Sequence, residues 1–190
     1  MEFDLNKALE EYKAKDFEEQ ESLKKIKEFL HNNNNCFSRT NLKGHITAGA
    51  LVIDNECNIL LNHHKILDIW VHFGGHSDGE KNSLKVAKRE VLEECGIDKI
   101  NDLEGKILDV DVHLIPENKS KNEPEHYHYD IRFLFIAKER QFKISQESTE
   151  IKWVTIEEAK KMITNKATIR MINKAYLMYN QNNEKMQNET

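Results

Sequence analysis

Helical spacing of apolar residues marks the first part of the chain. Between residues 4 and 30 the apolar positions form two successive helical faces, namely Leu5, Leu9 and Tyr12, then Leu23, Ile26, Phe29 and Leu30. The pair Lys15-Asp16 marks a break between the faces, with Asp16 a candidate N-cap. The run from Asn32 to Asn35 ends the pattern because Asn is a poor helix former. We therefore predict a helical extension over residues 1–40 that packs on a main domain.

The rest of the chain alternates between strand and helix patterns. Strands are predicted over residues 45–54, 58–64, 70–73, 106–115, 126–137 and 150–154, and helices over 82–95, from 156 onward, and over 166–179. Both faces of the first strand are apolar, which is typical of a central strand. Thr155 and Glu158 fit a capping box, and Gly96 suits the left-handed position after a helix. The pattern predicts an α/β fold with a mixed sheet and helices on both faces, in a main domain over 41–180 followed by a polar tail over 181–190.

Composition narrows the class of protein. A chain of 190 residues with a formal net charge of −5 gives no electrostatic support to a role in coating nucleic acid. The sequence contains no apolar run long enough to span a membrane, and its acidic start does not resemble a signal peptide. Cys36, Cys57 and Cys95 are widely spaced and lack zinc-binding spacing. We predict a cytoplasmic protein with reduced cysteines.

The candidate chemistry lies in the predicted helix over residues 82–95. Glu90, Glu93 and Glu94 are three and four residues apart, so a helix places them on one face within about one turn. Their mutual repulsion would be relieved by a bound cation, and carboxylate oxygens favour Mg²⁺ or Mn²⁺. The ordinary alternative is a solvated acidic helix face.

A specific motif favours the metal interpretation. Residues at matching spacing resemble the Nudix box, namely Gly75, Arg89, Glu90, Glu93, Glu94, Gly96 and Ile97. The first glutamate of that motif falls on Lys81, while Glu80 is one residue out of register. Further similar segments, at His45-Ile46-Thr47 and from His126 to Phe133, resemble a bacterial-type subfamily of Nudix hydrolases in which that glutamate is often absent. Lys81 is then a subfamily feature.

The resemblance implies a fold, an activity and roles for residues. It implies a Nudix-type α/β/α sandwich and metal-dependent hydrolysis of a small-molecule nucleoside diphosphate derivative by activated water. Glu90, Glu93 and Glu94 would be metal ligands together with the Gly75 carbonyl, and Arg89 would orient a glutamate. The general base is left open. Glu147 and Glu150 lie in a suitable region, but they fit solvated loop acids equally well, and a glutamate of the box could serve instead.

Histidines form a second candidate feature. His126, His128 and Asp130 share one face of a predicted strand, and His76 follows the glycine pair. They suit either a second metal site or a phosphate-facing wall that binds substrate, whereas structural histidines are the ordinary alternative.

Two other functions compete with the hydrolase. Lys81 motivates a non-catalytic Nudix module that binds a nucleotide or a partner, but a pure binding module has no need of the three glutamates. Isomerisation of a prenyl diphosphate would require a cysteine beside a matched acid, and no cysteine has that context. The oligomeric state stays open, with a homodimer among the options.

Overall fold

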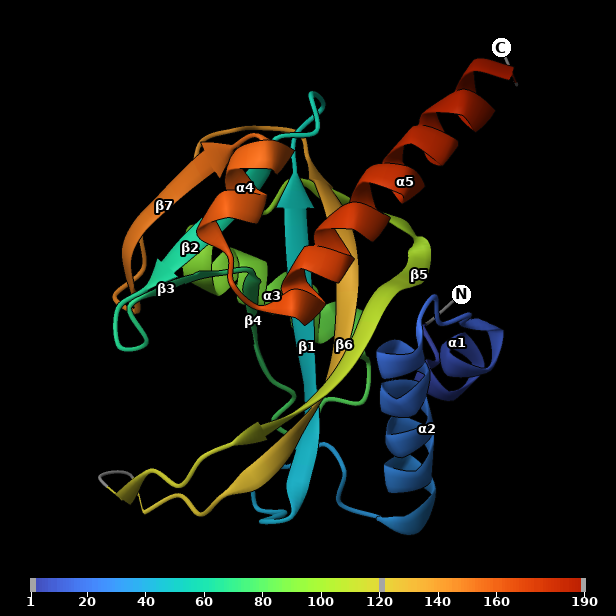
Figure 1. The fold of residues 1–190 in the computed structure, drawn as a ribbon, viewed down its shortest axis with the longest axis vertical. Helices are drawn as coiled ribbons and strands as arrows, with labels where there is room; N and C mark the ends of the chain where they lie inside the picture. The colour runs from blue at the N-terminus through green and yellow to red at the C-terminus, as the bar shows by residue number, and fades with distance from the viewer. Residues whose placement is uncertain (1–2, 120–121, 189–190) are drawn as a thin grey trace. The chain divides into compact units, whose positions relative to one another are not determined.

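The sheet is built around strand β1 (Gly44–Ile53), in which all ten residues are buried. The computed structural model describes residues 3–119 and 122–188. Seven strands follow the order β3-β2-β1-β6-β5, with β4 paired to β1 and β7 paired to β2. Figure 1 labels these strands and the helices α1 to α5. The predicted α/β class and the central place of β1 are therefore confirmed, because a strand that is apolar on both faces needs neighbours on both edges.

Contacts divide the chain into two units. The first contains residues through Gly49, then Gly74–Glu90 and Gly105–Phe133. The second contains Ala50–Phe73, Val91–Glu104 and the residues from Leu134 onward. These units do not follow the predicted boundaries at 1–40, 41–180 and 181–190, which stay predictions of sequence organisation.

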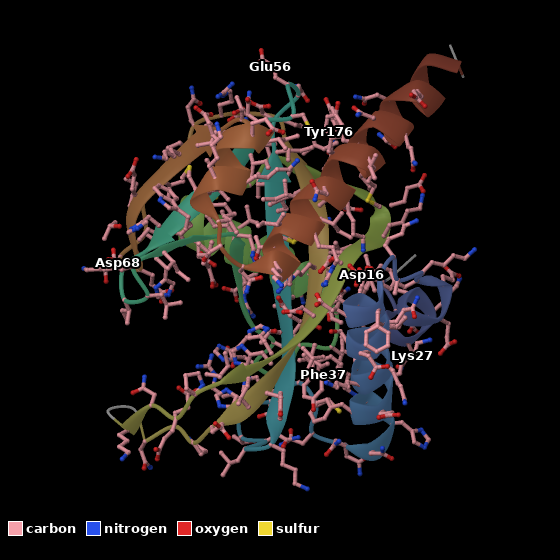
Figure 2. The ribbon with its side chains drawn as sticks, viewed as in Figure 1. Asp16, Lys27, Phe37, Glu56, Asp68 and Tyr176 are labelled. Atoms are coloured by element: carbon pink, nitrogen blue, oxygen red, sulfur yellow. The ribbon has the colours of Figure 1, made fainter. Side chains whose placement is uncertain are left out.

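Two helices begin the first unit. Helix α1 (Leu5–Glu11) and helix α2 (Phe17–Asn32) lie side by side in Figure 1, and the Asp16 side chain caps α2 by accepting a hydrogen bond from the Glu19 amide. Lys27, labelled in Figure 2, pairs with Glu10 at 3.3 Å. Phe29 of α2 stacks on Tyr129 with ring centroids 4.0 Å apart. Helix α2 therefore contacts strand β6 (His126–Ala137) through this aromatic pair.

The first unit also holds the predicted glycine-containing loop. Gly74 and Gly75 belong to a short strand, β4 (Phe73–His76), so the prediction that the preceding strand ends at residue 73 is wrong. Strand β3 (Ile69–Val71) pairs with β2 (Ile59–His64), whereas β4 pairs with β1. The chain changes its pairing partner at residue 72, and alternation of apolar residues does not reveal such a change.

The second unit contains strand β2, the strands that pair with it, and the last helices. Strand β2 pairs with β7 (Ser148–Val154), and helix α4 (Ile156–Met162) packs on β2. The predicted capping box is confirmed, because Thr155 and Glu158 exchange side-chain and backbone hydrogen bonds. Asp68, labelled in Figure 2, has a φ of 55° in the turn between β2 and β3. Among the described helices, none is long and apolar enough to cross a membrane.

Two element boundaries and the exposure of one apolar residue differ clearly from the predictions. Strand β5 (Ile100–Ile115) begins six residues before the predicted position at 106; Glu104 and Gly105, with φ values of 56° and 67°, interrupt the regular alternation. Helix α5 (Lys166–Asn188) continues past residue 179 in spite of its asparagines, and no Pro or Gly interrupts it there. Helix α3 (Ser83–Cys95) exposes Leu92, although helical spacing places it with Val91 among the apolar residues that we expect to face the sheet.

Candidate active site

The predicted metal-binding motif spans β4, a short connection and α3. The Asn82 side chain accepts a hydrogen bond from the Lys85 amide at 2.9 Å and so caps the helix. Glu80 accepts a hydrogen bond from the Asn82 amide at 3.0 Å and pairs with Lys85 Nζ at 2.7 Å. Lys81 is exposed. Glu80 therefore fastens the start of α3, and its place one residue out of register has a structural use.

Gly75 and Glu90 approach closely. A Cβ atom added at Gly75 would lie 2.5 Å from Glu90 Oε2, so any larger residue would displace the carboxylate. Arg89 Nη2 donates to Glu90 Oε1 at 2.5 Å and to the His76 carbonyl at 2.6 Å. The glycine and the arginine together hold the Glu90 carboxylate against the backbone of β4.

The other two glutamates of the motif follow one turn later on α3. Glu94 Oε2 accepts a hydrogen bond from Asn62 Nδ2 of β2 at 3.0 Å, and Asn62 itself is buried. Glu93 is exposed. Asn62 was not singled out in the sequence. Only knowledge of where β2 lies relative to the end of α3 could have identified it.

The candidate general bases lie at strand β7. Glu147 and Glu150 are both exposed. Glu150 pairs with Lys152 Nζ at 3.6 Å, and the Glu147 carbonyl accepts a hydrogen bond from the Lys65 amide at 2.8 Å. These contacts position the backbone and leave the base assignment a prediction.

The predicted histidines gather in the first unit around one that was not predicted. His45 of β1, His76 of β4 and His128 of β6 each offer a ligand atom, and these atoms lie within 4.8 Å of one another. The ring centroids are 5.0 Å apart for His45 and His76, 4.9 Å for His45 and His128, and 5.1 Å for His76 and His128. His45 belongs to the site because β1 pairs with β4 and β6, which the sequence pattern does not specify.

These rings are held in their neutral form. Burial lowers the pKa of His45 to about 4, with His76 and His126 adding to the effect, while the Asn41 backbone opposes it. Burial and the neighbouring His76 and His45 lower the pKa of His128 to about 3. Burial also lowers the pKa of His76. Each neutral ring keeps one nitrogen lone pair at neutral pH.

Asp130 belongs to a different environment. Its Oδ1 accepts a hydrogen bond from Thr47 at 3.0 Å, and its Oδ2 accepts one from Arg132 Nε at 2.7 Å. Arg132 also donates to Asp109 at 3.3 Å and to Asp111 at 3.1 Å. Both Asp130 oxygens are engaged in this buried network, which favours a structural role over the predicted contact with substrate.

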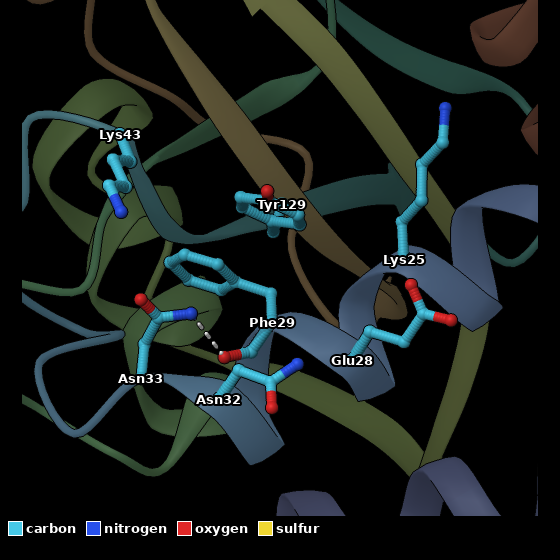
Figure 3. Close-up of a pocket in the computed structure, with 7 residues that line it drawn as sticks. All are labelled: Lys25, Glu28, Phe29, Asn32, Asn33, Lys43 and Tyr129. Carbon is cyan, nitrogen blue, oxygen red and sulfur yellow. Dashed lines mark hydrogen bonds between the residues drawn. The ribbon is translucent and has the colours of Figure 1, made fainter.

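A shallow pocket of about 380 Å³ lies beside α2. Figure 3 shows its lining, and the Asn33 side chain there donates to the Phe29 carbonyl at 2.9 Å. The lining residues are Lys25, Glu28, Phe29, Asn32, Asn33, Lys43 and Tyr129. None of them is a predicted site residue, and the charges are mixed. This pocket therefore gives no guide to the chemistry.

Comparison with known families defines the class of protein. A model of the NUDIX domain matches residues 43–174, which include the β4–α3 motif and the three histidines. The chain therefore belongs to the Nudix family. This match confirms the predicted family, the Nudix-type fold and a hydrolase activity directed at diphosphate linkages. The family generally uses divalent metal ions.

Individual relatives give finer likenesses. The chain is 30% identical over 130 residues to a probable DHNTP pyrophosphohydrolase from Lactococcus lactis subsp. cremoris, covering 68% of this chain and 76% of the relative. Its fold resembles that of an Ap4A hydrolase from C. elegans, with a TM-score of 0.58, 18% identity and coverage of 70% and 96% of the two chains. The dihydroneopterin triphosphate pyrophosphohydrolase of E. coli gives a TM-score of 0.52, 16% identity and coverage of 67% and 91%. These two structural likenesses concern the fold alone.

Proposed function

We propose that the chain hydrolyses a diphosphate linkage in a small nucleotide-type triphosphate, with Mg²⁺ or Mn²⁺ held by Glu90, Glu93, Glu94 and the Gly75 carbonyl. The packing of the Glu90 carboxylate on Gly75 carries this proposal, because it brings one carboxylate of α3 against the backbone of the residue whose carbonyl is the fourth proposed ligand. A pteridine triphosphate is the first substrate to test, given the Lactococcus relative.

The donor set fits a hard divalent cation. All the proposed ligands are oxygen atoms, which Mg²⁺ and Mn²⁺ prefer. Arg89 holds Glu90 from one side, and Asn62 holds Glu94, so two carboxylates have fixed orientations before any ion arrives. The exposed Glu93 completes the i, i+3, i+4 set on the helix.

The residues of the chain have separate tasks in the proposed reaction. A bound divalent ion supplies charge neutralisation at the diphosphate and a lower pKa for the attacking water. Arg89 and Asn62 orient the carboxylates, while Glu147, Glu150 or one of the box glutamates accepts the proton from water. The water oxygen bonds to phosphorus as the bridging P–O bond breaks, and the bridging oxygen leaves with the other product.

The predicted roles of the histidines follow from their environments. His126 and His128 were predicted either to face phosphate or to bind a second metal, and His76 was predicted to bind substrate. The ring nitrogens of His76 and His128 support a metal site, as argued below. Asp130 then supports the strand through Arg132. Cytoplasmic location and a homodimer stay predictions.

A substrate panel tests the proposed function. The purified chain is incubated with dihydroneopterin triphosphate, nucleoside triphosphates, diadenosine tetraphosphate and ADP-ribose, with Mg²⁺, Mn²⁺ or EDTA. We expect metal-dependent release of pyrophosphate or nucleotide from a triphosphate, measured by phosphorus NMR. No metal-dependent cleavage anywhere in the panel would overturn the proposed substrate class.

Matched variants locate the metal site. Glu90→Gln and Glu94→Gln keep the shape of the side chain but remove a ligand charge, so we expect at least a roughly tenfold loss of kcat. Glu139→Gln removes an equal charge from an exposed pair with Lys99 and should leave the rate unchanged. Equal rates in all three variants would remove the α3 carboxylates from the site.

A further inference from the structure

The three-histidine cluster has unsatisfied nitrogen atoms. Neither ring nitrogen of His45 has a hydrogen bond of normal geometry, and His76 Nε2 also lacks one, although all three atoms are buried. His45 is 2% exposed. A buried polar group without a partner costs about 1–3 kcal/mol, so native structures usually retain one only for a reason. A missing ligand is such a reason.

The positions of the three rings suit one small ion. His45, His76 and His128 come from three paired strands, which hold them from different directions. A tetrahedral ion with bonds of about 2.0–2.1 Å would bring its nitrogen ligands to about 3.3 Å from one another. Their present spacing, within 4.8 Å, requires only modest rotation of the rings.

His126 fixes the tautomer of His128. His126 Nδ1 lies 2.8 Å from the Pro124 carbonyl, which only accepts, so this nitrogen carries the proton. In the neutral ring, His126 Nε2 is then an acceptor, and His128 Nε2 at 3.2 Å donates to it. His128 therefore keeps its lone pair on Nδ1. Histidine ligands of metals are commonly oriented through the other ring nitrogen in this way.

We propose that His45, His76 and His128 form a second metal site, selective for a nitrogen-preferring divalent transition ion such as Zn²⁺. Neutral imidazoles suit Zn²⁺, whereas Mg²⁺ prefers oxygen. No carboxylate is a member of the group. Three protein ligands leave one coordination position for water or another donor. The ion joins β1, β4 and β6, and His126 acts as a positioning residue.

The proposed site has consequences for the neighbouring motif. His76 directly follows Gly75, and its carbonyl accepts the hydrogen bond from Arg89. A bound ion would therefore fix the backbone that supports Glu90. The histidine site binds its ion through ring nitrogens, whereas the proposed carboxylate site uses oxygen atoms. The two sites can therefore be distinguished experimentally.

Metal titration of the full chain tests the proposal. The metal-free protein is titrated with Co²⁺ and then with Zn²⁺ in excess Mg²⁺, with visible absorption and equilibrium dialysis as readouts. We expect one equivalent of Co²⁺ with a tetrahedral spectrum, displaced by Zn²⁺ and unaffected by Mg²⁺. Binding that excess Mg²⁺ abolishes, or no binding at all, would overturn the proposal.

Variants assign the ligands. His45→Ala, His76→Ala and His128→Ala should each weaken Zn²⁺ binding by at least about 100-fold, while exposed His31→Ala should not. Glu90→Gln should retain the Zn²⁺ site while losing activity. If Glu90→Gln loses Zn²⁺ binding while the three histidine variants retain it, the ion is bound by the carboxylates and the proposal is wrong.

Two further measurements test the site even if the alanine variants do not fold. Ring-nitrogen NMR of the unchanged protein should show Zn²⁺-dependent shifts at three histidines, and the absence of such shifts would contradict the site. His126→Ala should weaken binding by about 10–100-fold, whereas His126→Gln, whose amide oxygen can accept from His128, should restore part of it and the cobalt spectrum. Equal losses in both His126 variants would overturn the positioning role.

Discussion

Two halves of one face of strand β6 use polar residues in opposite ways. His126 and His128 occupy the first half, and Asp130 and Arg132 occupy the second. In the second half, the Arg132 guanidinium contacts three aspartates, and both oxygens of Asp130 are engaged. In the first half, the cluster leaves both nitrogens of His45 and one of His76 without a hydrogen bond of normal geometry.

The difference distinguishes structure from a ligand site. A buried charge is tolerated where its partners satisfy it, and the arginine network meets that condition with charges that the strands themselves supply. The histidine cluster keeps neutral rings with free lone pairs, which the strands do not satisfy. We infer that the second half stabilises the fold by itself, whereas the first half needs an ion from outside.

The largest expected effect is loss of the arginine. Arg132→Met would leave Asp109, Asp111 and Asp130 close together without their cation, and removing one partner of a buried charge network costs about 3–5 kcal/mol. We expect the free energy of unfolding, measured by urea denaturation, to fall by that amount.

The surface pair of Arg39 and Asp78 is the matched control. Arg39 Nε lies 2.7 Å from Asp78, but both side chains are about half exposed, so Arg39→Gln should cost less than about 1 kcal/mol. Equal losses in the two variants would show that burial of the Arg132 network contributes nothing special, and the comparison would fail.

The two halves of the β6 face should lose their contributions to stability at different pH values. The pKa values of His45 and His128 in the folded chain lie at about 4 and about 3, below their ordinary value of 6.5. Between those folded-state values and pH 6.5, the unfolded chain therefore binds more protons than the folded chain does. In metal-free protein, stability is therefore present at neutral pH and falls as the pH drops below about 6.5. We expect a loss of about 2–3 kcal/mol between pH 7 and pH 4.5, roughly half the sum for two rigid sites, because water beside the half-buried His128 screens its charge.

The aspartates respond at a lower pH. Burial raises the pKa of Asp111, but the hydrogen bond from His113 and the charge of Arg132 outweigh it, so the pKa lies below its ordinary value of 3.8. The stability from Asp111 is present above that value and is lost as the pH falls through the lower folded pKa. Urea denaturation at a series of pH values should show two steps. A single loss below pH 4 would contradict neutral buried histidines.

The sequence predicted the elements well where local physics decides them. The Asp16 cap and the Thr155 capping box depend on neighbours in the chain, and both are confirmed. The change of pairing partner between β3 and β4 and the early start of β5 were missed. Both depend on partners distant in sequence or on an irregular backbone, which a period of two does not encode.

The site was predictable only as far as its motif. The spacing of Glu90, Glu93 and Glu94 on a helix follows from sequence alone. Asn62 and His45 were missed because each reaches its site through strand pairing. The shared face of Asp130 and His128 was predicted correctly, but alternation does not reveal which of them has satisfied partners.

The smallest expected effect is also the sharpest test of the comparison. His45→Leu replaces a buried ring that has two unsatisfied nitrogens by an apolar side chain, so in chelator it should leave stability unchanged or raise it by about 1 kcal/mol. His113→Leu removes a ring whose Nδ1 lies 3.1 Å from Asp111, and it should lower stability by about 1 kcal/mol. Urea denaturation in EDTA and then in Zn²⁺ measures the stability of both variants. Zn²⁺ should stabilise the His113 variant but not the His45 variant, because only a site that retains His45 can bind the ion.

If His45→Leu destabilises the metal-free protein as much as His113→Leu does, the nitrogens of His45 are already satisfied and the two halves of β6 do not differ in the way inferred.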